Sequence, residues 1–161
     1  MATELELAWA AGFFDGEGHV GIKRSHERRK CGIYMSLNLV VTVANTHAPT
    51  IAKFMQIVGV SGNTCVYPDR RPENKRNRIL YTARFSANHA YIVLKLLLPY
   101  LVTRKEQAEV GIAFRETFTT RKGRGKGHPI PPDVLELREQ FALQLKSIRA
   151  VGLLTPLTVP A

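Results

Sequence analysis

The chain has 161 residues and a formal net charge of +10 at pH 7, from 23 Lys and Arg against 13 Asp and Glu. Because 45% of its residues are hydrophobic, it can bury a core, which excludes a fully disordered chain. The charge indicates a polyanionic partner, either nucleic acid or an acidic membrane surface. A membrane-spanning helix is excluded, because the best apolar stretch, 91–102, is interrupted by Lys95 and Pro99.

The termini and the cysteines indicate an intracellular protein rather than a secreted one. The chain begins with acidic residues, Glu4 and Glu6, where a signal peptide would be basic. Cys31 and Cys65 have no further Cys or clustered His nearby, which argues against a zinc site and favours reduced thiols. We expect one domain over 1–150 followed by a short tail.

Local patterns predict a series of helices and strands. Thr3 and Glu6 have the spacing of a capping box, which begins a helix that ends at Gly16. Apolar and polar residues alternate over 34–44 as in a half-buried strand, and a second capping box at 103–106 begins a later helix. In chain order the first predicted elements are a helix over 3–16 and two strands, from 19 and over 34–44, which flank a basic tip at 26–32. A helix over 51–58 follows, and then two strands over 63–67 and 78–86, which flank a loop at 68–77. Helices are also predicted over 87–98 and 103–118, and a last helix after 132 has Val134, Leu137, Phe141, Leu145 and Ile148 on one side.

This order predicts an α+β fold, an α-β-β-α-β-β-α core in which two hairpins form one four-stranded antiparallel sheet with helices on one face. An antiparallel sheet commonly has one face in water, and here that face would be polar and basic. Between His19 and Ala90, twelve basic residues outnumber three acidic ones. This surplus favours a sheet that enters the major groove of DNA.

Two groups of side chains are candidates for DNA contacts. Arg and Lys hydrogen-bond guanine and Asn hydrogen-bonds adenine, so we expect the polar side chains of the open face to contact bases. These candidates are Lys23, Ser25, Arg28, Arg29, Ser36, Asn38, Thr42, Tyr67, Arg70, Arg76, Arg78 and Thr82. Arg24 is a weaker candidate, because it shares the inward parity of Val20 and Ile22. The glycine-rich basic run at 121–127 is either a solvated linker or a loop in which Lys122, Arg124 and Lys126 contact phosphates.

The end of the first helix combines two unusual features. Ala8, Gly12 and Gly16 are four residues apart and leave one side of the helix nearly bare, which favours close contact with another helix. Asp15 and Glu17 lie at the negative end of the helix dipole, where a bound divalent cation would offset the repulsion. If two such helices met along their bare sides, two carboxylate clusters could share metals. The alternative is that these acids are simply solvated.

The stretch Ala10 to Gly18, AAGFFDGEG, resembles the LAGLIDADG motif of homing endonucleases in its L-A-G-F-x-D-G-D-G form. The single motif, the chain length and the order of elements are similar to members that work as homodimers through their motif helices. The resemblance implies an intron-encoded enzyme that binds double-stranded DNA and cuts both strands of a long pseudo-palindromic target, leaving 3′ overhangs. It also implies Mg²⁺ as cofactor, with Mn²⁺ substituting and Ca²⁺ binding without cleavage. The implied interface residues are Ala8, Ala11, Gly12 and Asp15.

The resemblance also assigns roles at the site. Glu17 matches the essential metal-binding carboxylate, although Asp is commoner there. Asp15 and the Gly16 carbonyl are further candidate ligands, and the family's first acid usually has a capping role. Asn45 matches a polar residue that positions solvent, and Arg104 matches a basic residue near the scissile phosphate, so both are candidate catalytic residues.

Other functions remain open from the sequence. No Ser/His/Asp or Cys/His nucleophile set is evident, which favours direct hydrolysis, and we expect no small-molecule substrate. The same fold also serves intron maturases, which bind RNA, and a DNA-binding protein with an inactive motif would leave the carboxylates unused. The acid at Glu17 favours the nuclease.

Overall fold

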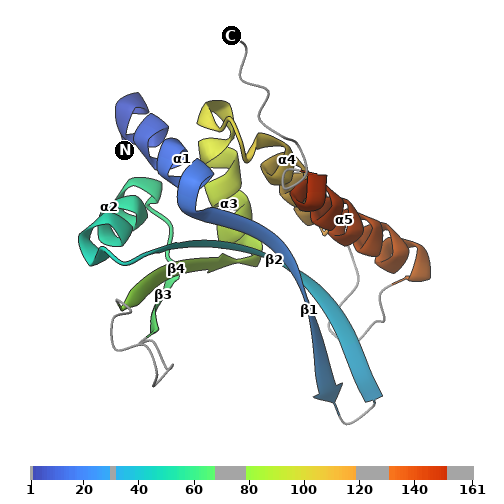
Figure 1. Ribbon diagram of the computed structural model, residues 1–161. Coiled ribbons are helices and arrows are strands. Elements are labelled where there is room, and N and C mark those ends of the chain that lie inside the picture. The colour runs from blue at the N-terminus through green and yellow to red at the C-terminus, as the bar shows by residue number, and fades with distance from the viewer. Residues whose placement is uncertain (1, 30–31, 68–78, 119–130, 152–161) are drawn as a thin grey trace.

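The computed structural model describes residues 2–29, 32–67, 79–118 and 131–151 (Figure 1). The elements, in chain order, are α1 (Glu4–Glu17), β1 (Gly18–Arg29), β2 (Gly32–Asn45), α2 (Ala48–Val58), β3 (Asn63–Tyr67), β4 (Leu80–Ser86), α3 (Ala87–Leu97), the 3₁₀ turn η1 (Leu98–Tyr100), α4 (Lys105–Glu116) and α5 (Pro132–Val151). The predicted α+β order is confirmed. The predicted loop at 68–77 and the basic run at 121–127 lie outside the described residues, and so does 152–161 of the predicted tail.

The four strands form one antiparallel sheet in the order β1-β2-β4-β3. Figure 1 shows α1 to α5 on the same side of this sheet, and the sheet arches so that its other face is open and concave. The predicted architecture is therefore confirmed. None of the helices in the described ranges combines the length and the apolar character needed to cross a bilayer.

The core lies between the sheet and the helices. Val20, Leu39 and Val41 point from β1 and β2 towards the helices and are fully buried. Phe14 of α1 and Phe54 of α2 stack at 6.5 Å between ring centroids above them. Fully burying each such side chain contributes about 1.5–3 kcal/mol, so the alternation of β1 and β2 decides which face of the sheet stays open.

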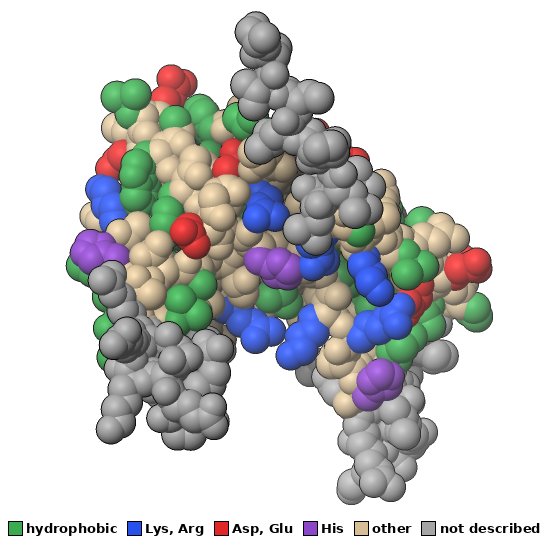
Figure 2. All heavy atoms as spheres, viewed as in Figure 1, with side chains coloured by type: hydrophobic (Ala, Val, Ile, Leu, Met, Phe, Trp, Pro, Cys, Tyr) green, Lys and Arg blue, Asp and Glu red, His purple; other side chains and the backbone are tan. Residues whose placement is uncertain are grey.

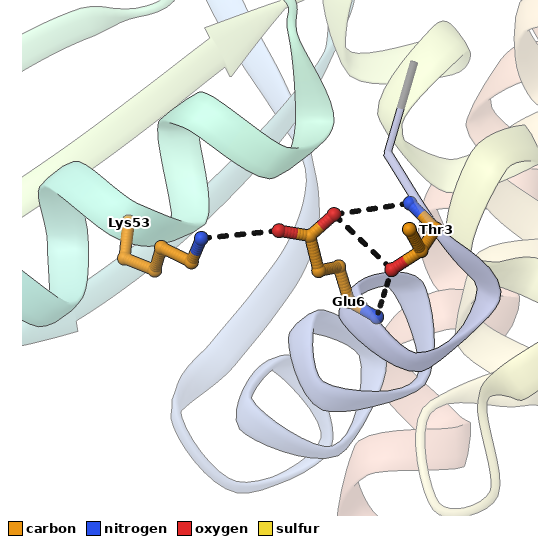
Figure 3. Close-up of polar contacts among 3 residues, drawn as sticks. All are labelled: Thr3, Glu6 and Lys53. Carbon is orange, nitrogen blue, oxygen red and sulfur yellow. Dashed lines mark hydrogen bonds and ion pairs between the residues drawn. The ribbon is translucent and has the colours of Figure 1, made fainter.

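The start of α1 is fixed by the predicted capping box (Figure 3). The amide of Glu6 donates to the Thr3 hydroxyl at 3.3 Å, and the amide of Thr3 donates to the Glu6 carboxylate at 3.0 Å. The Lys53 ammonium of α2 reaches the same carboxylate at 3.1 Å. The hydrogen bonds from Thr3, then the bond and charge of Lys53, lower the pKa of Glu6. One exposed carboxylate thus caps α1 and ties it to α2.

The turn from α1 into β1 accepts only glycine at position 18. A Cβ atom on Gly18 would lie 2.3 Å from the backbone oxygen of Phe14, which is fixed by the helix. We expect Gly18→Ala to move the junction and to lower the free energy of unfolding by about 1–3 kcal/mol, as overpacking does in cores. Urea denaturation followed by circular dichroism measures this change. Equal midpoints for the variant and the parent would contradict it.

Candidate nucleic-acid interface

Polar side chains form a row across the open face of the sheet. His19 of β1 pairs with Thr42 of β2, Thr42 pairs with Arg84 of β4, and Arg84 pairs with Asn63 of β3. Successive side chains of a strand alternate between faces, so these four share the face opposite the buried core residues. The row therefore crosses all four strands with two basic side chains and two neutral donors.

Further along the β1–β2 hairpin the open face stays polar. Lys23 pairs with Asn38, and both are exposed. Ser25 pairs with Ser36, and their hydroxyl oxygens are 2.7 Å apart. Figure 2 shows Lys and Arg side chains gathered in a hollow along this lower side of the molecule. The hollow is therefore lined with donors suited to a polyanion.

The structure places some sequence candidates on this face and removes others. Lys23, Ser25, Ser36, Asn38 and Thr42 lie on it as predicted. Thr82 shares the face but is only 8% exposed, so its hydroxyl offers little surface to a base, and the prediction for it is corrected. The remaining candidates fall outside the described part of the chain. For three of them only the side chain does so: Arg28, Arg29 and Tyr67. For the others the whole residue does so: Arg70, Arg76, Arg78, Lys122, Arg124 and Lys126.

Three polar residues of the open face were absent from the base-contact candidates. His19 follows the motif directly, and Arg84 and Asn63 lie on β4 and β3. The parity of Val20 in the sequence already indicated that His19 points outward. Arg24, by contrast, forms an ion pair with Glu139 of α5, which confirms that it points towards the helices.

Glu17 is the last residue of α1, and its carboxylate is a candidate metal ligand. It is exposed, and within the described ranges it makes no hydrogen bond or ion pair. Gly16 beside it is exposed as well. Carboxylate and backbone carbonyl oxygens are the ligands that Mg²⁺ prefers. However, no three His, Cys, Asp or Glu side chains of the described residues meet as a metal site, so one chain supplies only part of a ligand set.

Asp15 has a structural partner within its own chain. Its two carboxylate oxygens accept the backbone amides of Val102 and Arg104, each at 2.8 Å. Burial alone would raise the pKa of Asp15, but these two bonds and those from Thr103 together lower it. The capping box predicted at 103–106 is wrong: α4 begins at Lys105 without a local side-chain cap, because Asp15 of α1 takes that role.

We expect Asp15→Asn to lower the free energy of unfolding by about 1.5–3 kcal/mol, because an amide cannot accept both backbone bonds. The folded pKa of Asp15 is below its unfolded value, so its stabilisation is present above about pH 4 and is lost as pH falls through the folded pKa. Urea denaturation of both proteins at pH 7 and at pH 2.5 measures this. A gap between them that does not shrink in acid would contradict the assignment.

Asn45 and Arg104 both lie near the end of α1. Gly18, which follows Glu17, pairs with Val43, and Asn45 ends β2 two residues beyond Val43. Its side-chain oxygen accepts the His47 amide at 2.9 Å, which begins the turn into α2. The guanidinium of Arg104 donates through Nε to the Asp15 carbonyl at 3.4 Å. Sequence candidates from three separate segments are thus brought together.

The outer side of α1 is apolar and lacks large side chains near its end. Leu5 is 84% and Trp9 42% exposed, and Ala8, Gly12 and Gly16 are exposed on the same side. A Cβ atom at Gly12 or Gly16 would meet nothing within 4 Å. Ala11 was predicted to face a partner, but it is fully buried in its own core, so this prediction is corrected. A helix that is apolar on its exposed side as well as its buried side indicates a partner.

Homing endonucleases bound to DNA are among the solved structures that share this fold. The homing endonuclease I-CvuI, in complex with its target in the presence of 2 mM Ca, matches with a TM-score of 0.67 and 20% identity over 89% of this chain and 82% of its own. The archaeal intron-encoded homing endonuclease I-Vdi141I, complexed with DNA, matches with a TM-score of 0.68 and 13% identity over 90% of this chain and 84% of its own.

A third match differs in length. The LAGLIDADG homing endonuclease I-SmaMI, bound to cleaved DNA, matches with a TM-score of 0.54 and 18% identity over 99% of this chain but 52% of its own. The chain therefore spans about half of that protein. No protein-family model and no curated protein sequence matches the chain, so the likeness is one of fold. The resemblance noted in the motif is thereby confirmed in three dimensions: the chain has the fold of the LAGLIDADG homing endonucleases.

Proposed function

We propose that the protein is a divalent-metal-dependent endonuclease that binds double-stranded DNA on its concave sheet and cuts both strands as a homodimer. The observation that carries this proposal is the position of Glu17. Its carboxylate bonds to no described residue and lies where the exposed apolar side of α1 meets the basic open face of the sheet. The same end of α1 therefore faces a second subunit and the polyanion together.

The homodimer follows from the outer side of α1. Leu5, Ala8, Trp9 and Gly12 would pack against the same residues of a second copy, because a twofold interface pairs identical surfaces. Burying the two Leu5 and two Trp9 side chains removes apolar surface from water, and Gly12 lets the backbones approach. One copy covers 52% of the I-SmaMI chain, so two copies together match its length. A twofold dimer would bind a pseudo-palindromic target.

The residues at the end of α1 fit a divalent metal. Glu17 and the Gly16 carbonyl are oxygen ligands, and a second copy would double this incomplete set. When bound, the metal would supply an activated water and positive charge at the phosphodiester. Mg²⁺ is the expected ion, with Mn²⁺ as a substitute and Ca²⁺ as an ion that binds without supporting cleavage. Asp15 is less suited, because both its oxygens already accept backbone amides.

The remaining roles belong to side chains that position the substrate. Arg104 would hold a phosphate oxygen beside Glu17, since its guanidinium is anchored at the end of α1. Asn45 would position solvent there through its amide nitrogen, because the turn with His47 uses its side-chain oxygen. Lys23 and Asn38 would contact bases in the major groove. Two cleavage sites under the dimer axis would cut across the minor groove and leave 3′ overhangs.

The proposal is tested by incubating the purified protein with a library of randomised DNA duplexes and Mg²⁺, then sequencing the cleaved molecules. We expect a long site with approximate twofold symmetry, cut on both strands with 3′ overhangs. EDTA should abolish cleavage and Mn²⁺ should restore it. Tight binding to one sequence without cleavage in any divalent metal would contradict the enzyme. Affinity for a structured RNA in place of duplex DNA would support a maturase instead.

A further inference from the structure

The open face of the sheet carries an exposed leucine. Ala83 and Phe85 of β4 point into the core and are buried. Successive side chains of a strand alternate between faces, so Leu80, Thr82 and Arg84 share the open face. Leu80 is 38% exposed, and all the helices lie on the other side of the sheet (Figure 1). A single exposed leucine is common on protein surfaces, but this one lies on the face that the proposed function assigns to DNA.

The described neighbours of Leu80 on this face offer little polar surface. Thr82, two residues along β4, is only 8% exposed and pairs with Ala44 of β2, which presents a methyl group. On β3, Leu80 pairs with Tyr67, whose side chain lies outside the described residues. Leu80, Thr82 and Ala44 therefore form an apolar patch, which borders the polar row that crosses the sheet at Arg84.

One group of the major groove suits an apolar patch. Every base pair presents hydrogen-bond donors or acceptors there, and thymine adds a methyl group. A cytosine amino group or a guanine oxygen placed against leucine would lose its water without gaining a hydrogen bond, which costs free energy. A thymine methyl group placed against leucine removes apolar surface of both partners from water. The apolar patch therefore favours thymine over the other bases.

The patch lies within reach of a duplex that is held by the polar row. Leu80 and Arg84 are four residues apart on one strand, which corresponds to about 13 Å, and the major groove is about 12 Å wide. Resting on the proposed function, we propose that Leu80 recognises a thymine in each half of the DNA target by packing against its methyl group. Leu80 is thus a specificity-determining residue that contacts a base and takes no part in cleavage.

The test measures binding of the parent and of Leu80→Ala to the selected duplex in metal-free buffer. In further duplexes, one thymine of each half-site is replaced by uracil, which lacks only the methyl group. At one position this replacement should weaken binding of the parent about tenfold, because two buried methyl groups are lost. At that position Leu80→Ala should lose less than about twofold, since the partner of the methyl group is already absent.

Ile92→Ala is the matched control, because Ile92 is also exposed and apolar but lies on α3, on the other side of the sheet. It should keep the parental response to uracil at every position. Leu80→Ala should also keep the parental response at the other thymines, because the contact concerns one base in each half-site. Folding of each variant is checked by circular dichroism.

The outcomes separate this inference from the proposed function. If uracil weakens binding of the parent at no position, or if Leu80→Ala keeps every parental loss, the inference is wrong although the endonuclease stands. If Leu80→Ala fails to fold, Leu80→Asn takes its place, because asparagine is close to leucine in size but polar, and it should lose the same response. A parent that neither binds nor cuts any duplex contradicts the proposed function itself.

Discussion

Glu17→Gln should lower the rate of DNA cleavage in Mg²⁺ by at least about a thousandfold and leave DNA affinity within a fewfold of the parent. The change removes one negative charge without changing the shape of the side chain. Because Glu17 is exposed and bonded to no described residue, its loss should change the free energy of unfolding by less than about 0.5 kcal/mol. Single-turnover cleavage of the selected duplex and gel-shift titration measure the two effects.

The control for this prediction is Glu109→Gln, which removes the same charge from an exposed position on α4. It should cleave at the parental rate. If Glu17→Gln retains more than a tenth of the parental activity, the metal-binding role of Glu17 is wrong. If both variants lose activity equally, the loss reflects net charge instead of a metal ligand.

Gly12→Leu should convert the protein to a monomer that no longer makes double-strand breaks. The first atom of the new side chain meets nothing within 4 Å in its own chain, and position 12 is exposed, so we expect the subunit to fold as the parent does. Leucine also favours the helix over glycine by up to about 1 kcal/mol. Between two closely packed helices, however, the same side chain keeps the backbones apart. Sedimentation equilibrium gives the mass of the particle, and circular dichroism checks its folding.

Ala52→Leu serves as the matched control, because it adds a larger apolar side chain at an exposed position of α2. It should remain a dimer and cut both strands. A Gly12→Leu protein that sediments as a dimer and cleaves like the parent would show that the outer side of α1 is not the interface.

Local patterns in the sequence were sufficient to predict most of the fold. The alternation from Leu37 to Val43 in β2 predicts which side chains are buried, because one face of the sheet must be apolar. Thr3 and Glu6 predict the start of α1, because both partners of the capping box lie within one turn. The inward parity of Arg24 is a local property as well, and its ion pair with α5 confirms it.

Contacts between distant segments could not be predicted in this way. Asp15 caps the start of α4 from 89 residues away, so a local capping box was predicted where none forms. On α5 the hydrophobic pattern placed Leu137 inside, but Leu137 is 43% exposed and Arg138 is buried. Phe118 and Thr117 stabilise the buried arginine, and no local signal predicts those partners.

The most direct test of the central claim uses a mixed dimer, in which one subunit is the parent and the other carries Glu17→Gln. Different affinity tags on the two subunits allow its isolation, and the substrate is a supercoiled plasmid with the selected target. If each carboxylate serves the cleavage of one strand, the mixed dimer should nick the plasmid and leave the second strand intact. Conversion of the plasmid to the linear form at the parental rate would contradict the account.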